Sequence, residues 1–183
     1  MVWHWATRLV DHQARPRLLT RRQFERRAKR QLADGCGLPG ALLFIEVDRL
    51  LDAERVLGRR DCERVAHRFS ELITVVASEC PATMVTRDAA LVYAHSTTRS
   101  IDMAEAIRVA VQQELRLERL KVLDHYDQVR SPAMTHKHVL TVTVGASAFA
   151  LQQDFEEAIR RAEDALLQAK QAGGNRFLLS SAV

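Results

Sequence analysis

The stretch "PATMVTRDAALVYAHS", residues 81–96, decides the centre of the fold. It contains two short apolar runs, 82–85 and 90–94, which are separated by the polar triplet "TRD" at 86–88. Two apolar runs joined by a tight polar turn predict a β-hairpin. Such a turn lifts its carboxylate above the edge of a sheet, so Asp88 belongs either to a working site or to the remnant of one.

A second strand is predicted before the hairpin by "ALLFIEVD", residues 41–48. The run is continuously apolar and ends in two acidic residues, which is the pattern of a strand buried on both faces. Because side chains alternate along a strand, Glu46 and Asp48 are expected on the same face.

Helical periodicity and strand patterns divide the rest of the chain into alternating elements. Thr20 is the predicted N-cap of a helix that Gly35 ends. Helices are expected at 2–13, 21–34, 50–56, 61–78, 101–119 and 152–172, and further strands at 138–149 and 176–179. The order predicts an α/β sandwich with a central sheet of about five strands and helices on its faces. Residues 121–137 are polar and irregular.

Composition places the chain among ordinary globular proteins. It has 183 residues, of which 47% are hydrophobic and 27% charged, enough for one domain with a short extension. No apolar run approaches the ~20 residues that a bilayer-spanning helix needs. Three widely spaced cysteines and the lack of a secretory signal favour a reduced, cytoplasmic protein.

The net charge of +4 is unevenly distributed along the chain. Residues 1–30 hold nine Lys and Arg residues against only Asp11 and Glu25. A basic segment of this density can attract nucleic acid or an anionic membrane. Phe24 is the only aromatic residue among the arginines of 15–30, which argues against stacking on bases. A basic nucleic-acid-binding module is therefore kept as the third hypothesis, and a nucleic-acid partner is not expected.

Five stretches carry the pattern of a known family. In chain order they are "RLLTRRQFERR" (17–27), "LLFIEVDRLLDAERVLGRRDCERVAHRF" (42–69), "MVTRDAALVYA" (84–94), "LTVTVGAS" (140–147) and "AIRRAEDALLQAKQAGGNRF" (158–177). Together they resemble the GGDEF domain, the fold of the diguanylate cyclases, over roughly residues 14–180. The resemblance implies a class III nucleotidyl cyclase-like α/β fold. It divides the chain into an N-terminal helix and linker at 1–16 and a GGDEF-like domain at 17–183.

The resemblance also implies positions for a metal site. Family members join two molecules of GTP into cyclic di-GMP, and two carboxylates hold the Mg²⁺ that assists phosphoryl transfer. The matching positions here are Glu46, at the end of the strand, and Asp88, at the third position of the family's signature turn. An incomplete metal site and two charges with no metal are both left open.

Several positions of the signature turn depart from the family. Thr86 and Arg87 replace its two glycines, which let the main chain approach the nucleotide. Arg87 puts a long side chain where phosphate and ribose should lie. The fourth acid is Ala89, and the following Phe is Ala90. The resemblance is therefore to a degenerate GGDEF domain.

The nucleotide-binding positions are also altered. Glu54 and Glu63 match the two residues that recognise guanine. Glu63 can still accept hydrogen bonds from guanine, whereas Glu54 has no donor for the guanine O6 atom. Lys170 matches the phosphate-binding lysine, although it can equally be a cation that complements a helix end. Gly174 replaces an arginine that contacts phosphate.

The resulting hypothesis is a GGDEF-like domain that no longer makes cyclic di-GMP. It would be a regulatory or protein-interaction module, with weak guanine-nucleotide binding as an open point. The alternative is a divergent, active diguanylate cyclase that uses Glu46 and Asp88. Expected partners are another protein, a linked sensor or phosphodiesterase (EAL) domain, or a second copy of the chain. GTP and cyclic di-GMP are open as ligands. No cofactor is required, and Mg²⁺ is expected only with a bound nucleotide.

Overall fold

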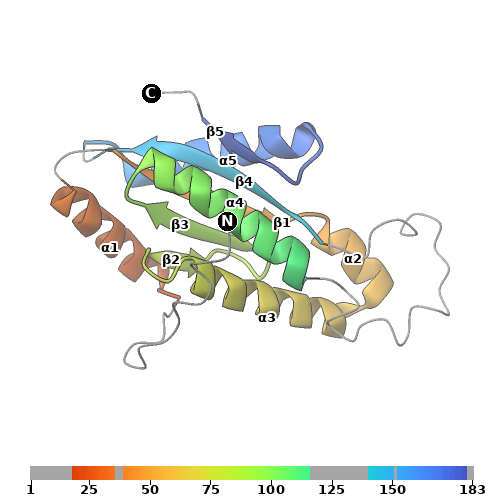
Figure 1. The fold of residues 1–183 in the computed structure, drawn as a ribbon. Helices are drawn as coiled ribbons and strands as arrows, with labels where there is room; N and C mark the ends of the chain where they lie inside the picture. Colours follow the sequence, from red (N-terminus) through yellow and green to blue (C-terminus); the bar gives the residue numbers. More distant parts are fainter. Residues whose placement is uncertain (1–17, 36–38, 116–139, 151, 181–183) are drawn as a thin grey trace, which may run out of the picture.

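Five strands in the order β2-β3-β1-β4-β5 form a mixed sheet with helices packed against both faces (Figure 1). The computed structural model describes residues 18–35, 39–115, 140–150 and 152–180. The helices are α1 (Arg21–Asp34), α2 (Leu50–Leu57), α3 (Arg59–Val76), α4 (Thr97–Glu114) and α5 (Phe155–Gln171). The strands are β1 (Gly40–Val47), β2 (Ala82–Met84), β3 (Ala89–Ala94), β4 (Val142–Phe149) and β5 (Phe177–Leu179).

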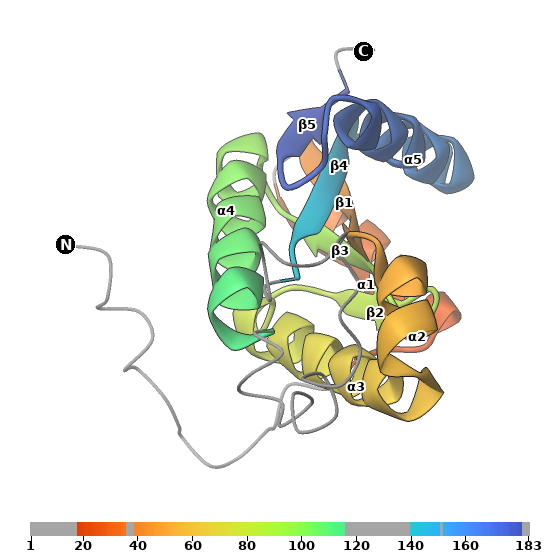
Figure 2. The same ribbon diagram turned by 90° about the vertical axis from the view of Figure 1, so that its right-hand side faces the viewer.

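The central strand β1 is buried on both faces, as its apolar run predicts. Leu43 and Ile45 belong to the core under α3 and α4, whereas Leu42 and Phe44 belong to the core under α1 and α5. Figure 2 shows these two helix pairs on opposite sides of the sheet. Strands β3 and β4 both run antiparallel to β1, and β5 is parallel to β4.

The first helix is fixed at its start by its own side chains. The Thr20 hydroxyl accepts a hydrogen bond from the Gln23 N–H, and the Gln23 side chain accepts one from the Thr20 N–H. This reciprocal pair satisfies two donors that a helix start would otherwise leave open. Phe24, Ala28 and Leu32 then bury one stripe of α1 against the sheet. The predicted cap at Thr20 is confirmed.

The helix predicted at 101–119 corresponds to α4, and its predicted limits are wrong. It runs from Thr97 to Glu114. The Ser96 hydroxyl accepts from the Arg99 N–H at 3.2 Å, and the Ser100 hydroxyl donates to the Thr97 carbonyl at 2.6 Å. These local hydrogen bonds start the helix in a polar stretch that apolar periodicity does not detect.

Strand β4 begins at Val142, later than the predicted start at residue 138. The predicted helix at 2–13, the linker at 1–16 and the irregular segment at 121–137 lie outside the described residues. Among the helices that the structure describes, none has the length and apolar character needed to cross a bilayer.

Candidate functional site

The fold brings the end of β1 next to the turn between β2 and β3. Glu46 pairs in register with Ala89, and the Val47 N–H donates to the Asp88 carbonyl oxygen at 2.9 Å. The two carboxylates predicted as metal ligands, Glu46 and Asp88, therefore come from neighbouring positions on adjacent chain segments. The helix α2 follows β1 directly and places Glu54 beside the same end of the sheet.

The turn itself adopts an ordinary backbone conformation without glycine. The N–H groups of Val85 and Thr86 both donate to the Ala89 carbonyl, at 2.8 and 3.3 Å. Neither Thr86 nor Arg87 has a positive φ, so neither position requires the conformational freedom of glycine. What the two substitutions add is side-chain bulk. The hydroxyl of the Thr86 side chain donates a hydrogen bond to the Asp88 carboxylate at 2.6 Å.

Arg87 connects the turn to α2. Its Nη1 atom donates to Oε1 of Glu54 at 3.2 Å, and its Nη2 atom makes a second, shorter contact with Oε2. A two-pronged guanidinium–carboxylate pair fixes geometry as well as charge. The hydrogen bond from Arg87 lowers the pKa of Glu54, and Arg59 lowers it further. The same contact raises the pKa of Arg87. Both groups are therefore charged at neutral pH.

Lys170 reaches the end of β1 from α5. Its ammonium group forms a short ion pair with Oε1 of Glu46. The two side chains are 30% and 32% exposed, respectively, so the pair is open to solvent on one side. Lys170, the candidate phosphate-binding residue, is thus paired with Glu46, a candidate metal ligand.

The second guanine-recognition candidate, Glu63, lies near the start of α3. It accepts from Nε of Arg59 at 3.0 Å in an i,i+4 ion pair. Both side chains are more than half exposed. Exposed pairs of this kind exchange readily with solvent and contribute little to stability. Glu63 is the most accessible of the acidic candidates.

The donor set does not fit a bound Mg²⁺. Two carboxylates are present, but the ammonium of Lys170 already lies against Glu46 and would repel a second cation there. Asp88 accepts the Thr86 hydroxyl, and Ala89 contributes only a buried methyl group. Over the described ranges, no cluster of three or more His, Cys, Asp and Glu side chains is arranged to hold a metal.

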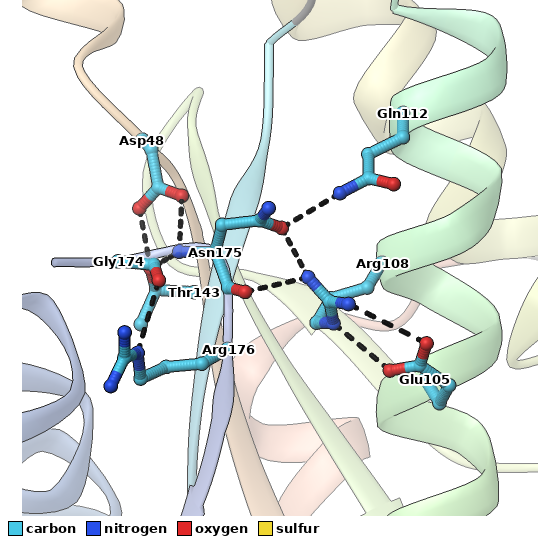
Figure 3. Close-up of polar contacts among 8 residues, drawn as sticks. All are labelled: Asp48, Glu105, Arg108, Gln112, Thr143, Gly174, Asn175 and Arg176. Carbon is cyan, nitrogen blue, oxygen red and sulfur yellow. Dashed lines mark hydrogen bonds and ion pairs between the residues drawn. The ribbon is translucent and has the colours of Figure 1, made fainter.

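A second polar cluster beside this site was not predicted, and it is built around Asp48 (Figure 3). The hydroxyls of Thr141 and Thr143 donate to its two carboxylate oxygens at 2.6 and 2.5 Å. The Asn175 N–H adds a third hydrogen bond at 3.0 Å. Asp48 thereby fastens the end of β1 to β4 and to the turn that follows α5.

That turn needs its glycine and is also held from α4. Gly174 has a φ of +68°, and a Cβ there would lie 3.2 Å from the Thr143 hydroxyl and 3.3 Å from Asp48. Asn175 follows with a φ of +50°. Arg108 donates to the Asn175 carbonyl at 2.6 Å and also contacts its side chain. Two threonines two residues apart at the start of β4, Thr141 and Thr143, together with a carboxylate just after the end of β1, are the signal that could have revealed this cluster.

Comparison with known proteins identifies relatives of the whole fold. The family model described as "Diguanylate cyclase, GGDEF domain" matches residues 14–176. The chain is similar to the GGDEF domain of DgcB from Caulobacter crescentus, solved in complex with c-di-GMP, with 17% identity, a TM-score of 0.69 and coverage of 95% of this chain and 100% of that one. It is also similar to the active GGEEF domain of a diguanylate cyclase from Vibrio cholerae, with 18% identity, a TM-score of 0.68 and coverage of 91% and 100%.

A further similar structure contains a protein partner. The diguanylate cyclase SiaD of Pseudomonas aeruginosa, solved in complex with its activator SiaC, has 19% identity to the chain and a TM-score of 0.63, with coverage of 86% of this chain and 55% of that one. At such identities the likeness to solved structures establishes the fold alone. The comparison with curated protein sequences finds no match.

Proposed function

The chain belongs to the GGDEF family of diguanylate cyclase domains, and we propose that it acts in cyclic di-GMP signalling without making cyclic di-GMP itself. In this proposal it is a regulatory or protein-interaction module. The observation that carries it is the bridge from Arg87 to Glu54. The side chain that replaces a glycine spans from the signature turn to the helix of the guanine-recognition position.

The ion pair between Arg87 and Glu54 opposes nucleotide binding through its location and not through its strength. The Arg87 and Glu54 side chains are 37% and 25% exposed, and partly exposed ion pairs contribute little to stability. A nucleotide could therefore displace Arg87 at a modest cost. It would still meet a long side chain at the turn and an acceptor-only carboxylate at the guanine position. The bridge supports weak nucleotide binding and argues against productive binding.

Missing contacts account for the proposed loss of turnover. Ala89 has no carboxylate, Gly174 has no guanidinium, and Lys170 is bound to Glu46. Removing a single group that stabilises a transition state commonly lowers kcat by about 10²–10³-fold. Two such losses, with a third group diverted, are enough to remove measurable cyclase activity.

The proposed partner is a protein. SiaD was solved with its activator, and another similar structure contains a coiled coil next to its GGDEF domain. By analogy, we propose that this domain exchanges signals with a linked sensor or EAL domain, with a separate protein or with a second copy of itself.

The test is an assay with GTP and MgCl₂, followed by chromatography for pppGpG and cyclic di-GMP. We expect neither product from the wild-type chain or from Arg87→Ala. Sustained synthesis that is lost in Asp88→Ala would instead establish the divergent cyclase and refute the proposal.

Calorimetry with GTP tests the bridge separately from turnover. Arg87→Ala is expected to raise GTP affinity by no more than about tenfold, because the ion pair that it removes is weak. Arg99→Ala is the matched control, since Arg99 is as exposed as Arg87 and also forms an ion pair, with Glu79. Equal GTP affinity in the wild-type chain and both variants would show that Arg87 does not obstruct the nucleotide.

A further inference from the structure

The outer face of α1 carries a concentrated positive charge. The helix holds six Lys and Arg residues against Glu25 and Asp34, so its net charge of +4 equals that of the entire chain. Four of the arginines are exposed, and we call them the basic stripe; they are Arg22, Arg26, Arg27 and Arg30. Positive charge is thus gathered on one rigid element.

No acidic side chain of the described residues neutralises the basic stripe. The two other cations of α1 have acidic partners: Arg21 binds Glu156, and Lys29 binds Glu25. No arginine of the basic stripe makes an ion pair or a side-chain hydrogen bond with the described residues. Within the part of the chain that the structure describes, the four guanidinium groups are thus open to an external anion.

The spacing of the basic stripe suits a linear polyanion. Arg22, Arg26 and Arg30 are four residues apart, so they follow one side of the helix over about 12 Å. The capping box at Thr20 holds the first turn of this helix in place, and the opposite stripe is packed in the core. Guanidinium groups bind phosphate oxygens through paired hydrogen bonds, which makes arginine well suited to a phosphate backbone.

The chemistry of the same face argues against other classes of partner. All large exposed apolar side chains of the described structure lie outside α1. A protein interface normally has an apolar centre, and a helix that lies in a membrane surface needs a free apolar face. The apolar stripe of α1 is already buried against the sheet. Single-stranded nucleic acid is disfavoured because, among the described residues, no aromatic side chain is exposed beside the arginines.

We propose that the basic stripe binds the phosphate backbone of double-stranded nucleic acid. Contacts of this kind position a protein on a duplex without reading its sequence. Figure 1 shows α1 at the opposite end of the molecule from α2, so the surface is separate from the candidate nucleotide site. Duplex binding by the basic stripe does not depend on the proposed function, so the duplex-binding experiment and the cyclase assay are independent tests.

The test measures fluorescence anisotropy of labelled 20-base-pair DNA and RNA duplexes with the whole chain at increasing KCl. Binding through four phosphates makes log K fall with log [KCl] at a slope of about −3.6, or roughly 100-fold between 50 and 200 mM. Replacing the basic stripe by glutamine is expected to reduce the magnitude of the slope by that amount and to abolish binding at 100 mM. Glutamine preserves helix propensity, and circular dichroism verifies the fold.

A control of equal charge makes the result specific. It replaces four exposed arginines that already have acidic partners, namely Arg49, Arg59, Arg64 and Arg160. We expect this variant to keep most of its duplex affinity. Equal loss in both variants would reduce the effect to net charge and overturn the proposal. The proposal would also be overturned if the chain bound vesicles with 30% phosphatidylserine, or polyglutamate, but did not bind the duplexes.

Discussion

Two carboxylates two residues apart, Glu46 and Asp48, have different roles because their neighbours differ. Glu46 is paired with one long, flexible cation. Asp48 accepts three hydrogen bonds from Thr141, Thr143 and Asn175. A carboxylate that is saturated by short, directional donors is a structural anchor, whereas one that is held by a single, partly exposed lysine can exchange partners.

Asp48→Asn is therefore expected to lower the free energy of unfolding by about 1.5–3 kcal/mol, because one amide oxygen cannot replace two carboxylate oxygens as acceptors. Urea titration measures this change, and faster hydrogen exchange at the Asn175 amide would locate it. Asp52→Asn is the control, since the ion pairs that Asp52 forms with Arg49 and Arg55 are exposed to solvent. Equal, small changes in both variants would rule out an anchoring role for Asp48.

At the scale of elements, helix α5 is packed directly on β4. A Cβ at Gly145 would lie 2.2 Å from the carbonyl oxygen of Ala162 and 2.2 Å from the N atom of Leu166. Both are main-chain atoms that cannot rotate away. The absence of a side chain at Gly145 therefore sets the distance between strand and helix, and with it the position from which Lys170 reaches Glu46.

Gly145→Ala is predicted to destabilise the domain by about 3 kcal/mol or more, since relief of the overlap requires the whole helix to move. Thermal and urea unfolding measure the loss. Gly35→Ala provides the comparison, because its Cβ would come no closer than 3.3 Å to a neighbouring atom, and we expect it to change stability little. A wild-type-like Gly145→Ala would mean that α5 is not held at this distance.

The aromatic contacts between α1 and α5 also belong to this scale. The rings of Phe24 and Phe155 are 5.9 Å apart, and Phe155 packs edge-on against Phe149 at 5.4 Å. Arg21 and Lys29 lie over the Phe155 ring. These contacts attach α1 to the sheet by its apolar side and leave its arginines on the outside.

At the scale of the whole molecule, the two cores contain groups that titrate only at alkaline pH. Burial raises the pKa of Cys62 to about 11 and that of Tyr93 to about 12. A thiol has its ordinary value near 9 in the unfolded chain. The folded state therefore binds the Cys62 proton more tightly than the unfolded state does.

The contribution of Cys62 to the free energy of unfolding should therefore be constant below about pH 9. It should fall as the pH rises from about 9 to 11, because over this range the thiol loses its proton in the unfolded state but keeps it in the folded state. Urea midpoints measured between pH 7 and 11 follow this decline. Cys62→Ala removes the thiol and is expected to make this decline smaller, leaving the part that begins near pH 10 and comes from Tyr93. An identical decline in that variant would assign the alkaline loss to other groups.

The sequence by itself determined the α/β architecture, because periodicity and caps act over a few residues. The apolar run of β1 shows locally that this strand is buried on both faces, and the Thr20 cap shows where α1 begins. The start of α4 was missed because hydroxyl groups, and not apolar side chains, define it. The positions of the candidate site followed from the resemblance of the hairpin and β1 to family motifs.

Only the tertiary structure decided what those positions do. Arg87 meets Glu54 across 33 residues, and Lys170 meets Glu46 across 124. Sequence shows that these charges exist but not which opposite charge each will reach, since many pairings are electrostatically equivalent in an unfolded chain. The sheet order and the packing of α5 on Gly145 select among these pairings. They place particular side chains within hydrogen-bond distance of each other and leave other charged side chains exposed to solvent.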